Sequence, residues 1–131
     1  MQLSVTSDVL EALLREARTN HPRECCGILL GKHDAVSAIL PAANVHASPR
    51  TQFEIDPQAL VNAHRAARED GLQVIGYYHS HPEGPAEPSA TDRAMAAGDG
   101  SVWAIIGSEG AQLWQSGKDG FQKLSYRVIA A

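Results

Sequence analysis

The spacing of apolar residues along the chain predicts helices and short strands in alternation. Over residues 7–19, apolar side chains recur every three or four positions and would line one face of a helix; they are Val9, Leu10, Leu13, Leu14 and Ala17. An unbroken apolar run over residues 25–31 indicates a buried strand, and residues 35–40 are its expected hairpin partner. An irregular loop is expected over residues 41–50, and residues 52–55 can form another short strand.

The second half of the chain continues this mixture. Asp56-Pro57 predicts the cap and first turn of a second helix, which would run to about Asp70. A strand is expected over residues 73–79 and a third helix over residues 89–97. Three further strand-like runs, separated by glycine-containing turns, suggest an antiparallel meander over residues 102–107, 111–115 and 121–128. The fold class that follows is α/β, a single domain over residues 1–131 with about three helices packed on a mixed sheet.

Composition and charge then remove several classes of protein. Hydrophobic residues make up 44% and charged residues 20% of the 131 residues, which are ordinary proportions for a globular domain. The formal net charge of −4 leaves no broad cationic surface for nucleic acid or for an anionic membrane. No apolar run approaches the roughly 20 residues that cross a bilayer. Residues 1–8 lack the basic and apolar segments of a signal peptide, so no membrane partner is expected.

The two cysteines, Cys25 and Cys26, are neighbours in the sequence. Adjacent cysteines cross-link no distant segments, so a disulfide scaffold is not expected, and a reducing, cytoplasmic setting is favoured. Both cysteines are interpreted first as small buried strand residues.

The residues that point to chemistry lie between His79 and Asp92. Strand side chains alternate, so His79 and His81 would face the same way, about 7 Å apart along the strand, and can share one metal ion. Pro82 ends the strand, and the proline-rich residues 82–88 are stiff enough to return the chain to a fixed place. Asp92 would come back in the first turn of the third helix as a third ligand. Two histidines and an aspartate with an open fourth position are typical of a catalytic zinc site.

Each of these features also has a simpler interpretation. A single His-x-His on a strand is a weak signal for metal binding. Ser89 and Asp92 have the spacing of a capping box at a helix start, which is compatible with a role for either residue in a site. Glu83 and Glu87, in the same loop, are expected to be solvated surface charges.

A zinc hydrolase also needs a general base that is not itself a ligand. Glu24 is the candidate, because it stands at the start of a predicted buried strand, where a carboxylate is costly unless it has a partner. A metal-bound water would be such a partner. The alternative is a surface glutamate at a strand end.

The motif His79-Ser80-His81-Pro82, six residues, Ser89, two residues, Asp92 resembles the signature of the JAMM/MPN+ metallopeptidases without a gap. The stretch from Pro22 to Gly31 resembles the segment that carries the family's catalytic glutamate, and Phe53-x-Ile55-Asp56-Pro57 is similar to the entry of its second helix. The resemblance extends over nearly the whole chain. It implies a curved mixed sheet of JAMM/MPN type, broadly similar to the cytidine deaminase architecture.

The resemblance also implies roles for five residues. His79, His81 and Asp92 would bind one zinc ion, with a water as its fourth ligand. Glu24 would hold and deprotonate that water, and Ser89 would donate a hydrogen bond to the oxygen of the tetrahedral intermediate. The implied reaction is hydrolysis of an amide that follows the C-terminal glycine of a ubiquitin-like protein.

The length of the chain suggests which of the family's substrates is expected. A bare domain of 131 residues resembles the small stand-alone prokaryotic branch, so the favoured substrate is an adduct of a sulfur-carrier protein with a Gly-Gly C-terminus, with release of cysteine in cysteine biosynthesis. The alternatives are removal of ubiquitin-like modifiers from lysine, a phage or cell-wall type of peptidase, and an interaction module without activity. A zinc nucleobase deaminase is disfavoured, because Cys25 and Cys26 do not form its Cys-x-x-Cys pair. The oligomeric state stays open.

Overall fold

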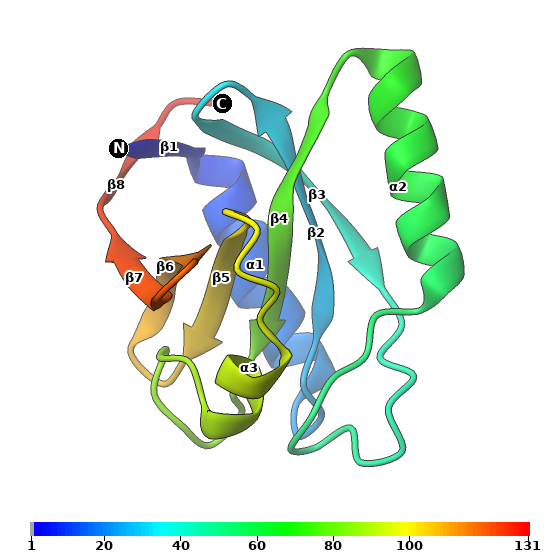
Figure 1. Cartoon of the computed structure of the whole chain (residues 1–131), viewed down its shortest axis with the longest axis vertical. Coiled ribbons are helices and arrows are strands. Elements are labelled where there is room, and N and C mark those ends of the chain that lie inside the picture. Colours follow the sequence, from blue (N-terminus) through cyan, green and yellow to red (C-terminus); the bar gives the residue numbers. More distant parts are fainter. Residues whose placement is uncertain (1) are drawn as a thin grey trace.

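A mixed eight-stranded sheet runs through residues 2–131, the part of the chain that the computed structural model describes (Figure 1). The strands are β1 Leu3–Thr6, β2 Cys26–Lys32, β3 Ala35–Ala42, β4 Gln73–Ser80, β5 Val102–Gly107, β6 Gly110–Gly117, β7 Gly120–Leu124 and β8 Tyr126–Ile129. The helices are α1 Ser7–Asn20, α2 Pro57–Asp70 and α3 Ala90–Met95. The expected class, a single α/β domain with three helices, is confirmed.

The sheet is curled so strongly that its two ends approach each other. Its order is β7-β6-β5-β4-β2-β3-β1-β8, yet β7 and β8 are separated in sequence by Ser125 alone. The Tyr126 hydroxyl donates a hydrogen bond to the carbonyl of Ala111 on β6, at 2.8 Å, across this gap. Helix α1 contacts β1, β3, β5, β6 and β8, strands from both ends of the order, so the sheet wraps around this helix.

The strand β2 is apolar without interruption because both of its faces are covered. Leu29 packs in the cluster that contains Val9 and Leu13 of α1. Ile28 and Leu30 point to the opposite face and pack with Ala63 of α2, a helix that Figure 1 shows standing beside β4 and β3. The central strand is therefore fixed from two sides.

Local signals predicted α2 and most of the central strands correctly. Asp56 caps α2 by accepting a hydrogen bond from the backbone N–H of Gln58, and Gly71 ends the helix in a left-handed conformation. α3 is shorter than expected, since it ends at Met95. Residues 52–55 form no strand and contribute only an isolated bridge between Asn44 and Ile55.

Two expectations about the ends of the chain were wrong. The run 121–128 is not one strand of a meander: it breaks at Ser125, and β8 pairs in parallel with β1 at the other end of the sheet. The strand β1 itself was not predicted. A four-residue strand with two buried apolar residues, Leu3 and Val5, is too short for the alternation of apolar and polar residues to predict it. The same alternation does not show that β8 pairs with a different strand from β7. None of the helices within residues 2–131 is long and apolar enough to cross a membrane.

The proline-rich loop after β4 packs tightly on the end of β5. A Cβ at Gly107 would overlap the backbone of Pro85 and Ala86, whereas a Cβ at Gly84 would lie 3.7 Å from the nearest atom, the Cβ of His81. We expect Gly107→Ala to lower the free energy of unfolding by about 1–3 kcal/mol, because the loop backbone must move away. Urea denaturation would measure this loss, with Gly84→Ala as the matched control at about 0.5 kcal/mol or less. Equal stabilities of the two variants would contradict the close packing of the loop.

Candidate active site

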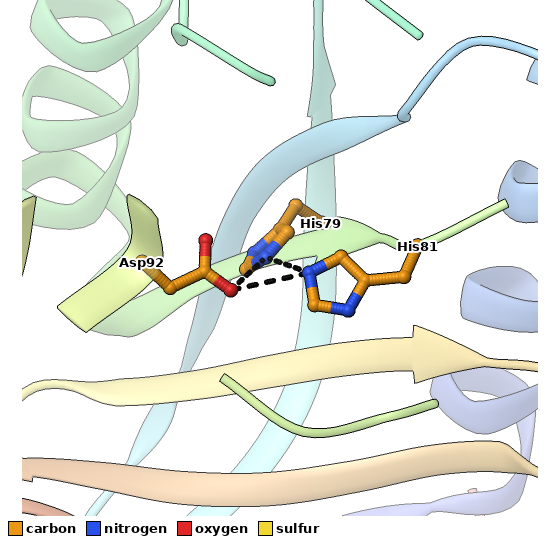
Figure 2. Close-up of side chains that lie close together, drawn as sticks. All are labelled: His79, His81 and Asp92. Carbon is orange, nitrogen blue, oxygen red and sulfur yellow. Dashed lines mark hydrogen bonds and ion pairs between the residues drawn. The ribbon is translucent and has the colours of Figure 1, made fainter. Parts of the chain in front are cut away.

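Three side chains from two elements converge at the end of β4. His79 is in β4, His81 follows it directly, and Asp92 lies in the first turn of α3. The Nε2 atom of His79, the Nε2 atom of His81 and the Oδ2 atom of Asp92 lie 3.1 Å from one another. Figure 2 shows the three side chains pointing toward one another. His79 and Asp92 are buried, and these three residues form the group within residues 2–131 whose ligand atoms could hold a metal ion.

The size of this triangle fits a tetrahedral metal ion. Bonds of about 2.0–2.1 Å to nitrogen or oxygen place two ligand atoms of a tetrahedron about 3.3 Å apart, close to the observed 3.1 Å. The Nδ1 atom of His81 lies 2.9 Å from the carbonyl oxygen of Pro85, which can only accept a hydrogen bond. A neutral His81 therefore presents a lone pair from Nε2 to the carboxylate of Asp92 and the ring of His79. A cation at the centre would satisfy all three groups.

The charges of the three groups depend on one another. Burial by itself raises the pKa of Asp92, but the hydrogen bonds with His79 and His81 outweigh burial and hold this pKa well below its usual range. Burial lowers the pKa of His79, which favours the neutral imidazole that binds metals. Burial lowers the pKa of His81 too, but hydrogen bonds to Asp92 and to the carbonyl of Pro85 outweigh it and raise the pKa overall.

Asp92 and Ser89 also form the capping box that the sequence predicts. The backbone N–H of Asp92 donates to the Ser89 hydroxyl oxygen at 3.0 Å, and the backbone N–H of Ser89 donates to Asp92 Oδ2 at 2.9 Å. The capping box is thus confirmed, and it orients the carboxylate that faces the two histidines. Because the Ser89 oxygen accepts in this bond, its own hydrogen is free to donate to another group.

The strand register brings Glu24 to the same place. Cys26 pairs with His79 in the antiparallel ladder of β2 and β4, and the backbone N–H of Ser80 donates to the carbonyl of Cys25. Continuing this register by one further residue places Glu24 opposite His81. Glu24 lines a cleft of about 330 Å³ together with His81, Ser89 and Arg50. The carboxylate predicted as a base thus lies beside the histidine that it would have to serve.

Glu24 is a buried acid, only 5% exposed. Burial raises its pKa from 4.5 to about 7, while the neighbouring His81 lowers and Asp92 raises this pKa by smaller amounts. A carboxyl group that titrates near neutral pH can accept and return a proton at little cost. The alternative of an ordinary surface glutamate is therefore wrong.

Two aromatic side chains to which the sequence assigned no role in the site hold the first histidine in place. The ring of Phe53 stacks on the ring of His79, with centroids 4.2 Å apart and planes 17° apart. Trp103 meets the His79 ring edge-on at 5.7 Å. Phe53 lies just before α2 and Trp103 in β5, so only the tertiary structure brings them to β4. Glu83 and Glu87, which were expected to be solvated surface charges, are both exposed, and they are not among the residues of the candidate metal group.

The second histidine is oriented by the proline-rich loop. The backbone of Ala86 is fixed on both sides: its N–H donates to Glu109 Oε1 at 2.6 Å, and its carbonyl accepts from Trp114 Nε1 at 3.0 Å. The preceding carbonyl, that of Pro85, is therefore held against His81 Nδ1. Such outer hydrogen bonds fix the ring orientation of metal-binding histidines.

The two cysteines take no part in this group. Burial raises the pKa of Cys25 to about 11 and that of Cys26 to about 12. Both are protonated thiols at neutral pH, whereas metal ligation and nucleophilic attack require the thiolate. Cys26 packs instead with Phe53 and Trp103, as a small core residue.

Comparison with known proteins agrees with this geometry. The chain is 39% identical to a protein named desampylase from Haloferax volcanii over 136 residues, which cover 97% of this chain and 96% of the relative. It is 45% identical over 80 residues to a probable TtuB-protein conjugate cleaving protease of Thermus thermophilus, covering 61% of this chain and 51% of the relative. It is 29% identical to a CysO-cysteine peptidase of Mycobacterium tuberculosis, covering 79% of this chain and 72% of the relative.

Solved structures show the same fold. A protein of Desulfitobacterium hafniense superposes with a TM-score of 0.89 at 29% identity, covering 100% of this chain and 94% of that protein. A JAB1/MPN domain protein of Archaeoglobus fulgidus superposes with a TM-score of 0.66 at 18% identity, covering 97% of this chain and 96% of that protein.

Residues 6–117 match the family described as prokaryotic homologs of the JAB domain. The matched family spans most of the chain, and the relative named desampylase aligns over nearly all of it, so this chain belongs to the prokaryotic JAB family, as a small member of the JAMM/MPN peptidases.

Proposed function

We propose that this protein is a zinc-dependent peptidase that hydrolyses the amide following the C-terminal glycine of a ubiquitin-like or sulfur-carrier protein. The observation that carries the proposal is the convergence of His79, His81 and Asp92, with ligand atoms 3.1 Å apart, beside the buried carboxyl of Glu24. Relatives named desampylase, TtuB-conjugate protease and CysO-cysteine peptidase support the class of substrate.

His79, His81 and Asp92 would hold the zinc ion, which when bound supplies Lewis-acid polarisation of a carbonyl and lowers the pKa of a water molecule. Glu24 accepts the proton of the attacking water and returns it to the leaving amine, a role that suits a carboxyl whose pKa is about 7. The Ser89 hydroxyl, which is free to donate, stabilises the carbonyl oxygen as negative charge develops on it. Phe53 and Pro85 keep the two histidine rings in position.

The favoured substrate is a carrier protein whose Gly-Gly terminus bears cysteine, so that the reaction releases cysteine. A Gly-Gly tail has no side chains and can enter a cleft of about 330 Å³. The alternative amine is a lysine side chain, since a relative is named desampylase. An interaction module without activity is disfavoured by the complete set of five residues, which such a module does not need.

The reaction can be tested with carrier proteins extended at Gly-Gly by cysteine or joined there to lysine. We expect mass spectrometry to show cleavage directly after the second glycine, loss of activity with a chelator, and recovery with zinc. Glu24→Gln keeps the shape of the side chain but cannot take the proton, so we expect a loss of about 10²–10⁴-fold in kcat. Glu69→Gln, the same charge change at an exposed residue of α2 outside the cleft, is the matched control. Full activity of Glu24→Gln, or cleavage unaffected by the chelator, would refute the mechanism.

Ser89 has two separable functions, which two substitutions can resolve. Ser89→Ala removes both the hydroxyl donor and the helix cap, whereas Ser89→Gly removes the donor and costs the cap only a few tenths of a kcal/mol. We expect both variants to lose about 10²–10³-fold in kcat, while thermal denaturation shows a clear loss of stability only for Ser89→Ala. If Ser89→Gly retained activity, the serine would be a cap alone.

The raised pKa of Glu24 also predicts a pH-dependent stability of the metal-free protein. The folded state binds this proton more tightly than the unfolded chain, so stability falls as pH rises from about 4.5 to about 7. Glu24→Gln removes this effect and leaves the histidines and Asp92 unchanged. In urea denaturation, we expect Glu24→Gln to match the wild type near pH 4.5 and to exceed it by on the order of 2 kcal/mol at pH 8. A difference independent of pH would show that Glu24 titrates normally.

A further inference from the structure

We propose that Arg50 is a specificity residue that binds the free carboxylate of the leaving amine, so that the enzyme releases an α-amino acid in preference to a lysine side chain. This inference rests on the proposed function and extends it to the amine side of the scissile bond. It is carried by the position of Arg50 in the cleft, which Glu24 also lines.

The backbone around Arg50 is tied to the backbone of Glu24. The N–H of Glu24 donates to the carbonyl of Pro49 at 2.7 Å, so the residue just before Arg50 is bonded directly to the predicted base. The turn continues with the N–H groups of Thr51 and Gln52, which both donate to the carbonyl of Ser48. Arg50 thus extends from a closed turn.

A single amide side chain strengthens this connection. The Nδ2 atom of Asn44 lies within hydrogen-bond distance of the carbonyls of Glu24 at 3.1 Å, Gln52 at 3.0 Å and Pro49 at 3.4 Å. Its Oδ1 accepts from the backbone N–H groups of His46 and Glu54, at 3.1 Å each. The loop is therefore held at both ends around one side chain, and Arg50 is presented from a defined backbone.

The proposed chemistry assigns the amine to the side of the cleft where Glu24 lies, and the loop of Arg50 is bonded to the backbone of Glu24. Ser89 faces the carbonyl oxygen and Glu24 delivers the proton to the leaving nitrogen, so the amine departs on the Glu24 side. In an amino acid joined through its α-amino group, the carboxylate is attached to the carbon next to that nitrogen. In an isopeptide, four methylene groups and the α-carbon separate the nitrogen from the carbonyl of the lysine.

The charges around the cleft make Arg50 the natural partner of a carboxylate. The other charged residues that line it are acidic, Glu24, Glu83 and Glu87, with His81 at the candidate metal site. Among the described side chains of residues 2–131, which do not include that of Asp70, no carboxylate oxygen lies within 4.0 Å of the Arg50 guanidinium; the ion pairs there are those of Asp92 with His79 and His81. A guanidinium forms paired hydrogen bonds with a carboxylate. Arg50 lines the cleft and has no ion-pair partner among the described side chains, so its guanidinium is available to a carboxylate there.

The test compares amine groups that differ only in their carboxylate. The substrates are a carrier protein whose Gly-Gly terminus is extended by serine, the same protein extended by serinamide, and the same protein joined to the side chain of Nα-acetyl-lysine methylamide. Serine replaces cysteine so that no thiol can bind the metal. The variants are Arg50→Gln and Arg50→Lys, with Arg23→Gln as the matched control: Arg23 is exposed and adjacent to Glu24 in sequence but does not line this cleft.

We expect the wild type to prefer serine over serinamide by about 10–100-fold in kcat/KM, the factor that a hydrogen-bonded charge pair supplies, mainly through KM. Arg50→Gln should abolish the preference by slowing only the serine substrate, Arg50→Lys should retain part of it, and Arg23→Gln should retain it all. The Glu24→Gln protein should bind the serine and serinamide substrates without cleaving them. Calorimetric titration with the two substrates should then show the same preference for serine as a difference in Kd, and the additional substitution Arg50→Gln should remove that difference.

The outcomes separate this inference from the proposed function. Cleavage of serine and serinamide at equal rates, or equal losses on both in Arg50→Gln, overturns the role of Arg50 and leaves the peptidase standing. Faster cleavage of the lysine substrate by the wild type also overturns it. If none of the substrates is cleaved but calorimetry still shows a carboxylate preference that depends on Arg50, the site is upheld and the proposed reaction fails. Equal Kd values for the serine and serinamide substrates overturn the inference independently of any activity.

Discussion

The antiparallel register between β2 and β4 is the constraint on which the candidate site depends. It pairs Cys26 with His79 and Cys25 with Ser80, and therefore sets Glu24 opposite His81. The Ser80 hydroxyl reinforces the pairing by accepting from the backbone N–H of Cys25 at 2.9 Å. A slip by one residue would turn every side chain of one strand to the other face of the sheet. The packing of β2 between α1 and α2 opposes such a slip, so the core of the protein protects the geometry of its chemistry.

The remaining parts of the site come from α3 and from loops, and hydrogen bonds to backbone groups fix them. Asp92 is oriented by the cap it forms with Ser89, and His81 by the carbonyl of Pro85. Asn44 fixes the loop that carries Arg50 through bonds to several backbone groups. In each case a backbone group or a local cap holds the side chain, so the positions do not depend on flexible surface contacts.

The buried polar groups explain why a charged cluster is tolerated inside the protein. Ion pairs removed from water gain little unless their remaining hydrogen bonds are satisfied. Asp92 accepts from the backbone of Ser89 and faces two imidazoles, while Phe53 and Trp103 cover His79. Burial also raises the pKa of Glu24, because the neighbouring His81 offsets only part of the cost of burying its charge. Stability and function therefore oppose each other at this one carboxyl.

The sequence by itself determined the parts that depend on neighbouring residues. These are the caps of α2 and α3, the approximate extents of α1 and α2, and the buried strand of unbroken apolar residues. The five candidate residues follow from two motifs that resemble the JAMM/MPN+ signature. Tertiary structure alone decided that β8 joins β1, that Phe53 and Trp103 enclose His79, and that Arg50 lines the cleft. The physical reason is the distance along the sequence over which each effect acts. Capping and alternation arise within a few residues, whereas strand partners and loop positions follow from contacts between residues far apart in the chain, which leave no periodic signal in the sequence.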